Sequence, residues 1–375
     1  MNDRARSSTP VPSVDQTPLR ASDAGTTRFR RRFEGRFVGE YFRTTTWGVS
    51  ASSVGIGTYL GEANNRDDVA YQASVRAAIA RGVNLLDTAI NYRGQRSEQA
   101  IGSAIQEAIG AGEAMRDELV VCSKGGYIPL PRDAPATREE YQAYVKREFI
   151  DQEVVRPEEI VAGGHSLAPR FLRYCLAKSR QNLGLRTIDV YHLHNPGQQL
   201  VAVSRAELRQ RLRGAFVMLE EAAERGEIGV YGCATWDSLR VPPDHRAHVS
   251  LEEIVQVARE VAGQAHHCRV VQLPVNLAMP EAARDATQPL DGRLVTPLDA
   301  AAALGMTVIA SATLMQSKLA SGLPAELRAP FPRCTSDPQR AIEFVRTMPG
   351  ITTALVGMKQ LAHVEENLGG VRVTD

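Results

Sequence analysis

Hydrophobic residues follow two spacings along most of this 375-residue chain. From about residue 50, short runs of apolar residues alternate with longer stretches in which apolar residues recur every three or four positions. The short runs are typical of buried strands, and the longer spacing is typical of amphipathic helices. The predicted strand and helix pairs are Val54–Gly57 with Arg66–Arg81, Asn84–Asp87 with Ser97–Ile109, Leu119–Lys124 with Pro169–Leu183, Ile188–His194 with Ala206–Arg225, Val230–Ala234 with Leu251–Ala265, Val270–Asn276 with Thr296–Leu304, Thr307–Ser311 with Pro338–Thr347, and Thr353–Gly357 with Leu361–Leu368.

These strand-then-helix units favour an α/β fold, a (β/α)8 TIM barrel, over a doubly wound sheet. Several predicted helices stop at a glycine, as at Gly82, Gly184 and Gly226, which supplies the left-handed conformation that commonly ends a helix. The barrel domain is expected to cover residues 39–375. Tyr41–Ser50 precedes the first unit and is expected to form an N-terminal hairpin that closes the barrel floor.

One connection is much longer than the others. Gly125 to Ala168 separates the third strand from its helix, and Thr137 and Glu140 have the spacing of a capping box, which predicts a helix within the insertion. Long connections in compact domains are usually functional, and this one reaches the carboxyl-end face of a barrel, where active sites lie. Residues 127–166 are therefore expected to form a lid. Its aromatic residues are Tyr127, Tyr141, Tyr144 and Phe149.

The first 38 residues are rich in Ser, Thr, Pro, Asp and Arg and lack hydrophobic periodicity, which predicts a disordered N-terminal tail over 1–38. The run from Arg28 to Phe33 interleaves arginine with phenylalanine. Such a run suits a nucleic-acid or partner arm, but a tail that docks on its own domain is the commoner case and is favoured here.

Charge and composition narrow the class of protein. The 44 basic and 43 acidic residues nearly cancel, which argues against a protein that binds nucleic acid or a membrane surface through net charge. No stretch is apolar for the roughly 20 residues that a transmembrane helix needs, and the start lacks the pattern of a secretory signal. The five cysteines are scattered without a C-x-x-C motif, as in reduced cytosolic proteins, so a cytoplasmic location is expected.

Four side chains with complementary chemistry fall at the carboxyl ends of predicted strands or just beyond them. Asp87, Lys124 and His194 end the second, third and fourth strands, and Tyr92 lies five residues after Asp87. A tyrosine is a weak acid, with a pKa of about 10, and a neighbouring ammonium lowers that value. A buried lysine needs a counter-charge, which Asp87 provides, and a histidine can orient a substrate oxygen. Together they predict a general acid for a carbonyl oxygen.

Each of these residues also has a structural explanation: a helix-capping aspartate, a surface tyrosine, a lysine that reaches solvent or a core histidine. Their joint placement at strand ends favours the catalytic interpretation. His192 and His194 share a strand face and could form a metal pair, as could the His266–Cys268 run. No metal is expected, because His192 is predicted to point into the barrel beneath His194.

Several local strings resemble the aldo-keto reductase superfamily. They are Gly55-Ile56-Gly57-Thr58-Tyr59, the D-T-A-x-x-Y string from Asp87 to Tyr92, the S-E-x-x-x-G string from Ser97 to Gly102, Val121–Lys124, Ile188–Pro196, and Glu365–Leu368. They occur in family order over about residues 41–369. The resemblance implies a barrel enzyme that reduces an aldehyde or ketone with NAD(P)H, with Tyr92 as general acid, Lys124 and Asp87 as its pKa-lowering pair, and His194 as the orienting residue.

The resemblance also implies a cofactor site, with NADP(H) expected more than NAD(H). The residues that match its positions are Gly57, Thr58, Tyr59, Asp87, Asn195, Thr235, Gln272, Ser311, Leu314, Lys318, Gly357, Lys359, His363, Glu366 and Asn367. Three of them depart from the common pattern. Thr235 replaces an asparagine, Ser311 stands where many members stack an aromatic ring, and Lys359 is the only fixed cation in place of a Lys, Ser and Arg clamp for the 2′-phosphate.

The expected partner is a small-molecule carbonyl compound, with no nucleic acid and no membrane, and the sequence predicts no oligomeric state. Two alternatives stay open. A nicotinamide-binding regulatory or accessory subunit would explain the altered cofactor positions, although the intact set of four residues argues against it. A non-redox acid/base enzyme, such as a dehydratase, would keep that set for a different step.

Overall fold

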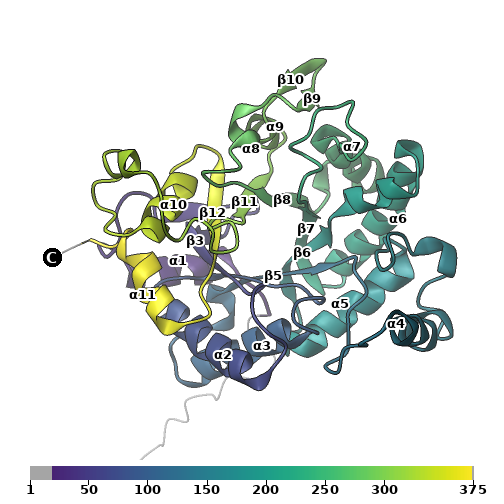
Figure 1. Cartoon of the computed structure of the whole chain (residues 1–375), viewed down its shortest axis with the longest axis horizontal. Helices are drawn as coiled ribbons and strands as arrows, with labels where there is room; N and C mark the ends of the chain where they lie inside the picture. Colours follow the sequence, from purple (N-terminus) through teal and green to yellow (C-terminus); the bar gives the residue numbers. More distant parts are fainter. Residues whose placement is uncertain (1–18, 374–375) are drawn as a thin grey trace, which may run out of the picture.

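In the computed structural model, which describes residues 19–373, eight parallel strands close into a barrel (Figure 1). The strand order around the barrel is β11-β12-β3-β4-β5-β6-β7-β8. The strands are β3 (Val54–Gly57), β4 (Leu85–Asp87), β5 (Val120–Gly125), β6 (Ile188–His194), β7 (Ile228–Ala234), β8 (Cys268–Pro274), β11 (Thr307–Ser311) and β12 (Ile351–Gly357). This architecture confirms the predicted (β/α)8 TIM barrel.

Each barrel strand is followed by a helix of the outer ring (Figure 1). These helices are α2 (Asn65–Ala80), α3 (Arg96–Gly110), α5 (Pro169–Leu183), α6 (Arg205–Glu224), α7 (Leu251–Ala262), α9 (Pro297–Ala303), α10 (Asp337–Arg346) and α11 (Leu361–Gly369). All eight predicted units are present, with boundaries shifted by a few residues at most strand and helix ends. A short helix α8 (Glu281–Arg284) and a hairpin of β9 (Gln288–Leu290) and β10 (Arg293–Val295) separate β8 from α9.

The barrel interior is a packed core. Alternate residues of the strands point inward, among them Leu85, Cys122, Val190 and Ile309, and they form one buried cluster. Branched apolar side chains of this kind fill the centre of a barrel and leave its carboxyl-end mouth for polar residues. A larger apolar cluster lies between the strands and the helices. No helix among residues 19–373 is long and apolar enough to cross a membrane.

The barrel floor is closed by the predicted hairpin and by a helix that the sequence did not predict. Strands β1 (Phe42–Thr44) and β2 (Ser50–Ser52) pair antiparallel, which confirms the hairpin. The prediction of a disordered tail over residues 1–38 is wrong for part of that segment, because Asp23–Arg32 form the ordered helix α1. Residues 1–18 of that tail lie outside the described residues.

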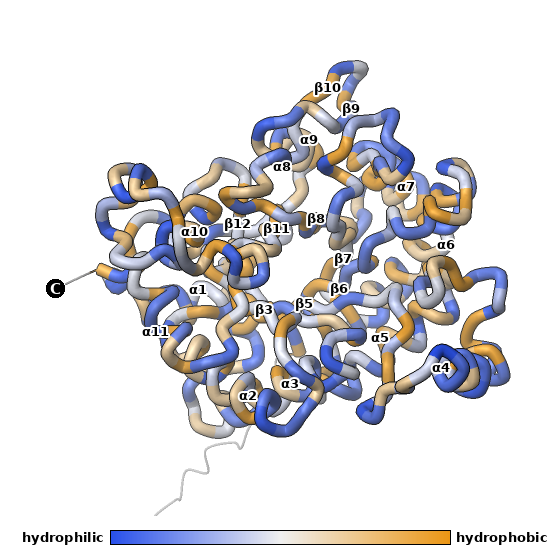
Figure 2. The backbone as a smooth tube through the Cα atoms, in the orientation of Figure 1, coloured by the Kyte–Doolittle hydropathy of each residue, from blue (hydrophilic) through white to orange (hydrophobic). Residues whose placement is uncertain are grey.

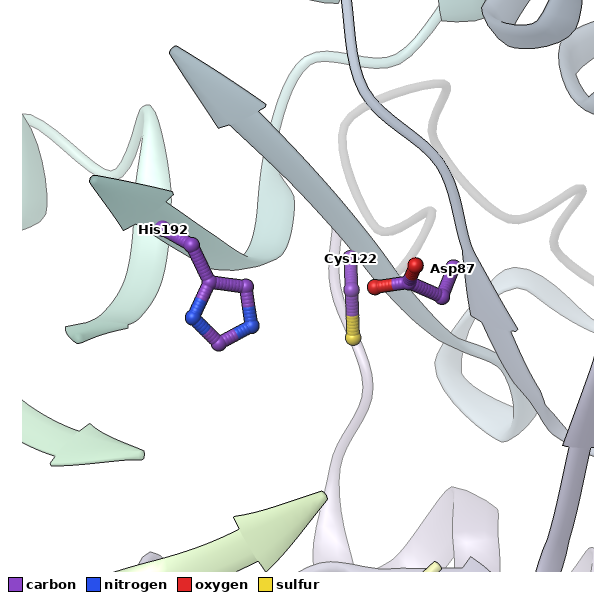
Figure 3. A group of neighbouring side chains, drawn as sticks. All are labelled: Asp87, Cys122 and His192. Atoms are coloured by element: carbon purple, nitrogen blue, oxygen red, sulfur yellow. The ribbon is translucent and has the colours of Figure 1, made fainter. Parts of the chain in front are cut away.

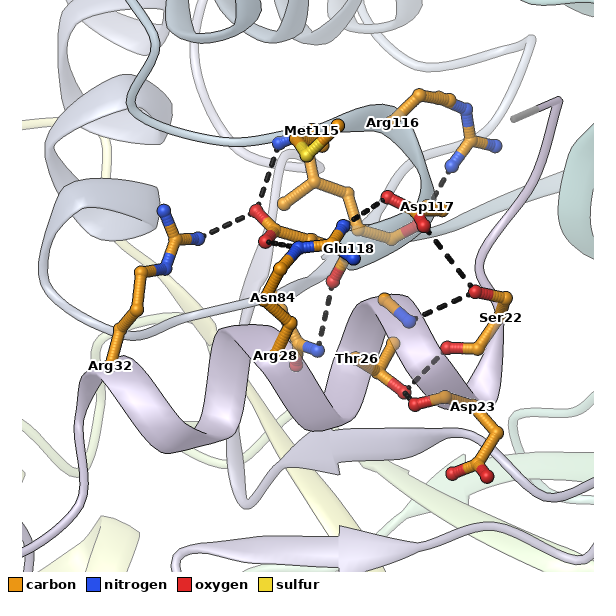
Figure 4. Close-up of polar contacts among 12 residues, drawn as sticks. Ser22, Asp23, Thr26, Arg28, Arg32, Asn84, Met115, Arg116, Asp117 and Glu118 are labelled. Carbon is orange, nitrogen blue, oxygen red and sulfur yellow. Dashed lines mark hydrogen bonds and ion pairs between the residues drawn. The ribbon is translucent and has the colours of Figure 1, made fainter. Parts of the chain in front are cut away.

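Helix α1 is held by one buried ring and by a set of ion pairs, and Figure 4 shows the ion pairs. Phe29 is fully buried beneath the barrel. Arg28 contacts both Asp117 and Glu118, at 2.6 and 2.8 Å, and Arg32 contacts Glu118 at 2.6 Å. The basic run singled out in the sequence therefore docks on its own domain, as favoured above.

The insertion after β5 forms a small unit with its own core. Helix α4 (Arg138–Val145) begins at the predicted capping box, continues as a π-helical turn over Lys146–Ile150, and is followed by a short 3-10 turn at Pro157–Glu159. Figure 1 shows α4 at the outside of the ring near α5, and the tube of α4 in Figure 2 is coloured mostly as hydrophilic. Phe149 and Val155 are buried with Phe171 of α5, so the insertion packs on the ring of helices.

Candidate active site

A cavity of about 410 Å³ opens among the carboxyl ends of the barrel strands. Its walls include one residue from the end of each of seven strands: Gly57, Asp87, His194, Ala234, Gln272, Ser311 and Gly357. A volume of this size suits a small-molecule site. The cavity lies where a barrel places an active site, and three of the four predicted catalytic residues line it: Asp87, Tyr92 and His194.

The fourth, Lys124, lies buried beside the cavity. The Lys124 ammonium donates to Asp87 Oδ2 at 2.6 Å and to the Thr88 carbonyl oxygen at 2.8 Å. Both charged side chains are at most 5 % exposed. A buried ammonium is tolerated only with such a counter-charge and satisfied hydrogen bonds, so this contact explains why a lysine can occupy the barrel mouth.

The second oxygen of Asp87 is also engaged. Gln272 Nε2 on β8 donates to Asp87 Oδ1 at 2.8 Å. The carboxylate is therefore fixed between a charged donor on one side and a neutral donor on the other. Gln272 keeps one amide hydrogen and the amide oxygen for a ligand in the cavity.

Tyr92 lies on the turn between β4 and α3. Lys124 Nζ is 5.0 Å from the centre of the Tyr92 ring, and the Tyr92 ring meets the His194 ring edge-on at 5.8 Å between centroids. The turn is anchored to α2, because Arg93 and Arg96 both donate to Asp68 on that helix. Both arginines are buried, so the ion pairs hold the turn, and with it Tyr92, at the barrel mouth.

The net shift in the pKa of Tyr92 differs from the expectation. Burial raises the pKa of the Tyr92 phenol, and the Lys124 ammonium opposes that rise without overcoming it. The expected lowering by Lys124 is therefore present, but the prediction of a net lowered pKa is wrong because burial outweighs it. Burial lowers the pKa of Lys124, but Asp87 and Tyr92 outweigh that effect and raise it overall. At neutral pH both groups keep their protons, as a proton donor and its activating ammonium require.

His194 stands opposite Tyr92 as a neutral imidazole. Burial lowers the pKa of His194 well below its usual range, and the Lys124 ammonium adds to that shift. The ring nitrogen Nδ1 is buried and has no hydrogen-bond partner among the described residues. A neutral ring in this position can hydrogen-bond a substrate oxygen without bringing a second positive charge to the site.

Comparison with known proteins agrees with this architecture. A sequence model of the aldo/keto reductase family matches residues 53–242, which is just over half of the chain. The chain belongs to the aldo/keto reductase family. The matched span includes all four residues of the predicted catalytic set.

Two curated relatives match parts of this chain. D-threo-aldose 1-dehydrogenase from a Pseudomonas species is 28% identical over 168 residues, 44% of each chain. Aldo-keto reductase YhdN from Bacillus subtilis is 32% identical over 88 residues, 23% of this chain and 25% of that protein. The matched regions therefore span less than half the length of either relative.

Solved structures with low identity share the fold. An aldo/keto reductase from Klebsiella pneumoniae, in complex with NADP and acetate, superposes with a TM-score of 0.59 at 18% identity, over 88% of this chain and 89% of that one. The holo form of aldo-keto reductase AKR11C1 from Bacillus halodurans gives 0.59 at 15% identity, over 88% and 90% of the two chains.

The structure gathers most of the expected cofactor residues in the cavity. Those that line it are Gly57, Thr58, Tyr59, Asp87, Asn195, Thr235, Gln272, Ser311, Leu314 and Gly357. The others, Lys318, Lys359, His363, Glu366 and Asn367, do not line it. Lys318, His363 and Glu366 are exposed and Asn367 is buried.

Lys359 has a partner that the sequence did not indicate. Its ammonium donates to Asp67 Oδ2 at 2.7 Å, and Asp67 also accepts the Glu62 backbone N–H at 2.7 Å. Lys359 lowers the pKa of Asp67, so the carboxylate is charged at neutral pH. The single cation of the expected phosphate clamp is thus already neutralised.

The cavity walls present polar atoms that suit a ligand rich in hydrogen-bonding groups. Thr235 Oγ1 and Asn91 Oδ1 are buried without a hydrogen-bond partner among residues 19–373, as is His194 Nδ1. A buried polar atom without a partner carries a desolvation cost of about 1–3 kcal/mol, which a bound ligand can recover. A nicotinamide ring with its carboxamide provides both donors and an acceptor, so the residues present fit such a group.

A second set of side chains lies deeper in the barrel. Asp87, Cys122 and His192 bring one ligand atom each within 4.8 Å of one another (Figure 3). His192 points into the barrel, as predicted, and is fully buried. The set suits a cation poorly, because Lys124 and Gln272 occupy both oxygens of Asp87 and the Lys124 ammonium would repel a metal ion.

Sequence reasoning missed several residues of the cavity wall. Trp236 is 43 % exposed in the cavity and follows Thr235, which was singled out. Asn91 lies within the recognised string that ends at Tyr92. Tyr127 was noted only as part of the lid. Trp236 and Asn91 are next in sequence to predicted site residues, and this was the signal that could have found them. Which of these side chains faces the cavity depends on the geometry of the loops.

Proposed function

We propose that this aldo/keto reductase reduces an aldehyde or ketone to an alcohol, with NADP(H) as the preferred cofactor and Tyr92 as the general acid. The cofactor supplies a hydride to the carbonyl carbon. The observation that carries the proposal is the arrangement of Tyr92 between the Lys124 ammonium and the His194 ring at the mouth of the barrel.

The roles of the four residues follow from their contacts. Asp87 stabilises Lys124 as an ammonium, which favours the phenolate that Tyr92 becomes after it gives its proton to the carbonyl oxygen. The neutral His194 is placed to hydrogen-bond the same oxygen and so to orient the carbonyl. Gln272 fixes Asp87 from the opposite side, so the carboxylate cannot turn away from Lys124.

The substrate side of the cavity is aromatic and polar. Tyr59, Tyr127 and Trp236 provide ring faces, and Asn91 provides an amide. Rings and amides together suit a polyhydroxy aldehyde, and one characterised relative is an aldose dehydrogenase. Reducing sugars therefore belong in the substrate panel beside simple aldehydes and ketones, and both reaction directions should be assayed.

Fluorescence titration with NADPH and NADH, followed by turnover of that panel, tests the proposal. Tyr92→Phe should leave cofactor dissociation constants nearly unchanged and lower kcat by at least about a hundredfold, the contribution expected of a general acid. Tyr141→Phe is the matched control, because its hydroxyl contacts only the insertion backbone. Cofactor binding without turnover of any substrate would favour an accessory subunit, and product formation without cofactor oxidation would favour a dehydratase.

A further inference from the structure

The two ends of the insertion meet beside His194. Tyr127 and His165 face each other as an antiparallel bridge. The backbone N–H of Ser166 donates to the Gly126 carbonyl oxygen at 2.8 Å, and that of Ile128 donates to the Gly164 carbonyl oxygen at 2.8 Å. The insertion therefore returns to the barrel as a short two-stranded ribbon at the mouth of the cavity.

A chain of hydrogen bonds runs from the outer helix α6 through this ribbon to His194. Arg211 Nη1 lies 2.6 Å from Gln199 Oε1, Gln199 Nε2 lies 2.6 Å from His165 Nδ1, and His165 Nε2 lies 2.7 Å from the His194 carbonyl oxygen. An arginine can only donate, so the Gln199 amide must present its oxygen to Arg211 and its NH₂ to His165. His165 Nδ1 therefore accepts, and Nε2–H donates to His194.

The surroundings enforce this direction. His165 and Gln199 are both fully buried. Burial lowers the pKa of His165 to about 4, so the ring is neutral at physiological pH and carries one proton. Gly126 has a φ of +143°, and a Cβ there would lie 3.0 Å from the His194 carbonyl oxygen and 3.1 Å from His165 Nε2. Only glycine at this position leaves room for the bond between the two histidines.

We propose that the Arg211–Gln199–His165 chain positions His194 for catalysis, which makes His165 a positioning residue supplied by the insertion. The inference rests on the proposed reductase function. The bond from His165 fixes the carbonyl of His194 at the end of β6, and Tyr127 contacts the His194 ring and the side chain of Asn195. The Tyr127 ring lies edge-on to His194 at 5.0 Å, and its hydroxyl accepts from Asn195 Nδ2 at 3.1 Å.

Few other ionisable groups face His165. Tyr127 contacts it from the start of the insertion, at 4.8 Å between ring centroids, and His194 contacts it from β6. Arg211 lies beyond Gln199 on α6 and also pairs with Glu207. Lys124 and His192 act on His194 from inside the barrel. No carboxylate is bonded to His165 within residues 19–373, so the pKa of His165 depends mainly on burial, which lowers it, and on the bond to the His194 carbonyl oxygen, which raises it.

Gln199→Glu reverses one link of the chain. A carboxylate accepts from Arg211 and also requires a proton on His165 Nδ1, so His165 must become an imidazolium to keep its bond to His194. The variant should raise the pKa of His165 from about 4 into the assay range. As the pH rises through the new value, Nε2 loses its proton and kcat should fall by about three- to tenfold, the worth of one hydrogen bond. KM and cofactor dissociation constants should stay within about twofold.

Gln198→Glu is the matched control, because it places the same charge one residue away from the chain. His165→Phe and His165→Gln provide a second test, since Phe cannot donate to His194 and the Gln amide can. We expect kcat to fall in the Phe variant and to recover in the Gln variant. A kcat profile of Gln199→Glu that matches Gln198→Glu at every pH, or equal kcat values for the two His165 variants, would overturn the proposal.

Imidazole ¹⁵N resonances of the resting protein separate this inference from the reductase proposal. The His165 signal is assigned by its loss in His165→Phe, and in the native protein it should show a proton on Nε2. In Gln199→Glu, the His194 signal should shift as His165 titrates. Absence of turnover with every carbonyl compound would refute the reductase function. The resonances would then still test the hydrogen-bond chain by themselves. A proton on His165 Nδ1 in the native protein would contradict the proposed hydrogen-bond chain, whatever the activity. A His194 signal that does not shift as His165 titrates would contradict it as well.

Discussion

The ion pair between Lys359 and Asp67 makes a sharp prediction about cofactor choice. NADPH carries a 2′-phosphate that NADH lacks, and Lys359 is the expected cation for it. Lys359 Nζ already lies 2.7 Å from Asp67 Oδ2, with side chains 31% and 9% exposed, so solvent screens the pair only in part. A phosphate must therefore share Lys359 with a charged carboxylate and also approach that carboxylate's negative charge.

Asp67→Asn removes the competing charge with little change of shape. An asparagine keeps an acceptor for the Glu62 N–H, which now donates to Asp67. A charge-assisted hydrogen bond is worth about 1.5–3 kcal/mol, or roughly ten- to a hundredfold in affinity. We expect the native protein to prefer NADPH by about tenfold or less, and Asp67→Asn to increase the preference to roughly ten- to a hundredfold, with NADH affinity unchanged.

The assay is fluorescence titration with both cofactors for four proteins: native, Asp67→Asn, Lys359→Ala and the double variant. Lys359→Ala should reduce the preference to unity or below, because the unpaired Asp67 carboxylate then repels the phosphate, and adding Asp67→Asn should return the preference only to near unity. Glu62→Gln controls for a general change in charge, since Glu62 is exposed nearby. Asp67 lies in the first turn of α2, so its loss should cost about 0.3–1 kcal/mol of stability, which thermal unfolding checks.

Two results would refute this reasoning. An equal decrease in the dissociation constants of NADH and NADPH in Asp67→Asn would mean that the substitution acts on a part common to both cofactors. A strong NADPH preference that survives Lys359→Ala would place the phosphate elsewhere, with Lys318 as the next candidate cation near the cavity.

Three further substitutions test other contacts. Lys124→Met removes the ammonium that opposes the raised pKa of the Tyr92 phenol, so the inflection in the pH profile of residual reduction should move to higher pH; an unmoved inflection would make Lys124 purely structural. His192→Leu replaces a buried imidazole without a hydrogen-bond partner among residues 19–373 and should raise the free energy of unfolding in urea by about 1 kcal/mol, whereas a clear loss would show that the ring is bonded in solution. Phe29→Ala should lower the free energy of unfolding by about 3–5 kcal/mol because its ring is fully buried, and a loss below about 1 kcal/mol would show that α1 does not depend on it.

The barrel could be predicted from the sequence because its signals are local. Each strand is a short apolar run, each helix has its own periodicity, and a glycine such as Gly184 ends α5 in the left-handed conformation. The predicted catalytic set could be placed for the same reason, since the carboxyl end of a strand in a barrel always reaches the mouth. Asp87, Lys124 and His194 needed only the strand boundaries.

Helix α1 shows where local signals fail. Its sequence is mostly polar and has no apolar stripe, because only Phe29 among its large side chains is fully buried. The rest of its attachment comes from Arg28 and Arg32, whose partners Asp117 and Glu118 lie some 90 positions further along the chain. Arginines that make ion pairs in the folded protein have the same composition as arginines in a disordered tail, so the pattern alone cannot separate the two.

Two contacts of the site could not be predicted for the same reason, because they join distant parts of the chain. Lys359 was treated as a free cation, yet Asp67 lies 292 positions before it. Gln272 was expected to serve only a ligand, yet it also holds Asp87 across 185 positions. A motif assigns a side chain its chemistry, but the partner that sets its charge and availability comes from tertiary structure. We therefore expect the Asp67 partner to weaken the preference for NADPH that Lys359 could otherwise give.

The insertion extends this argument to the substrate site. Its aromatic residues suggested a lid over the cavity, but Tyr141, Tyr144 and Phe149 pack within the insertion and against α5. Only Tyr127, at the point where the insertion leaves the barrel, lines the cavity. A segment that leaves and re-enters at one place can build its own core and still act on the site through its two ends. We therefore expect substitutions within α4 to change stability, and those at Tyr127 and His165 to change catalysis.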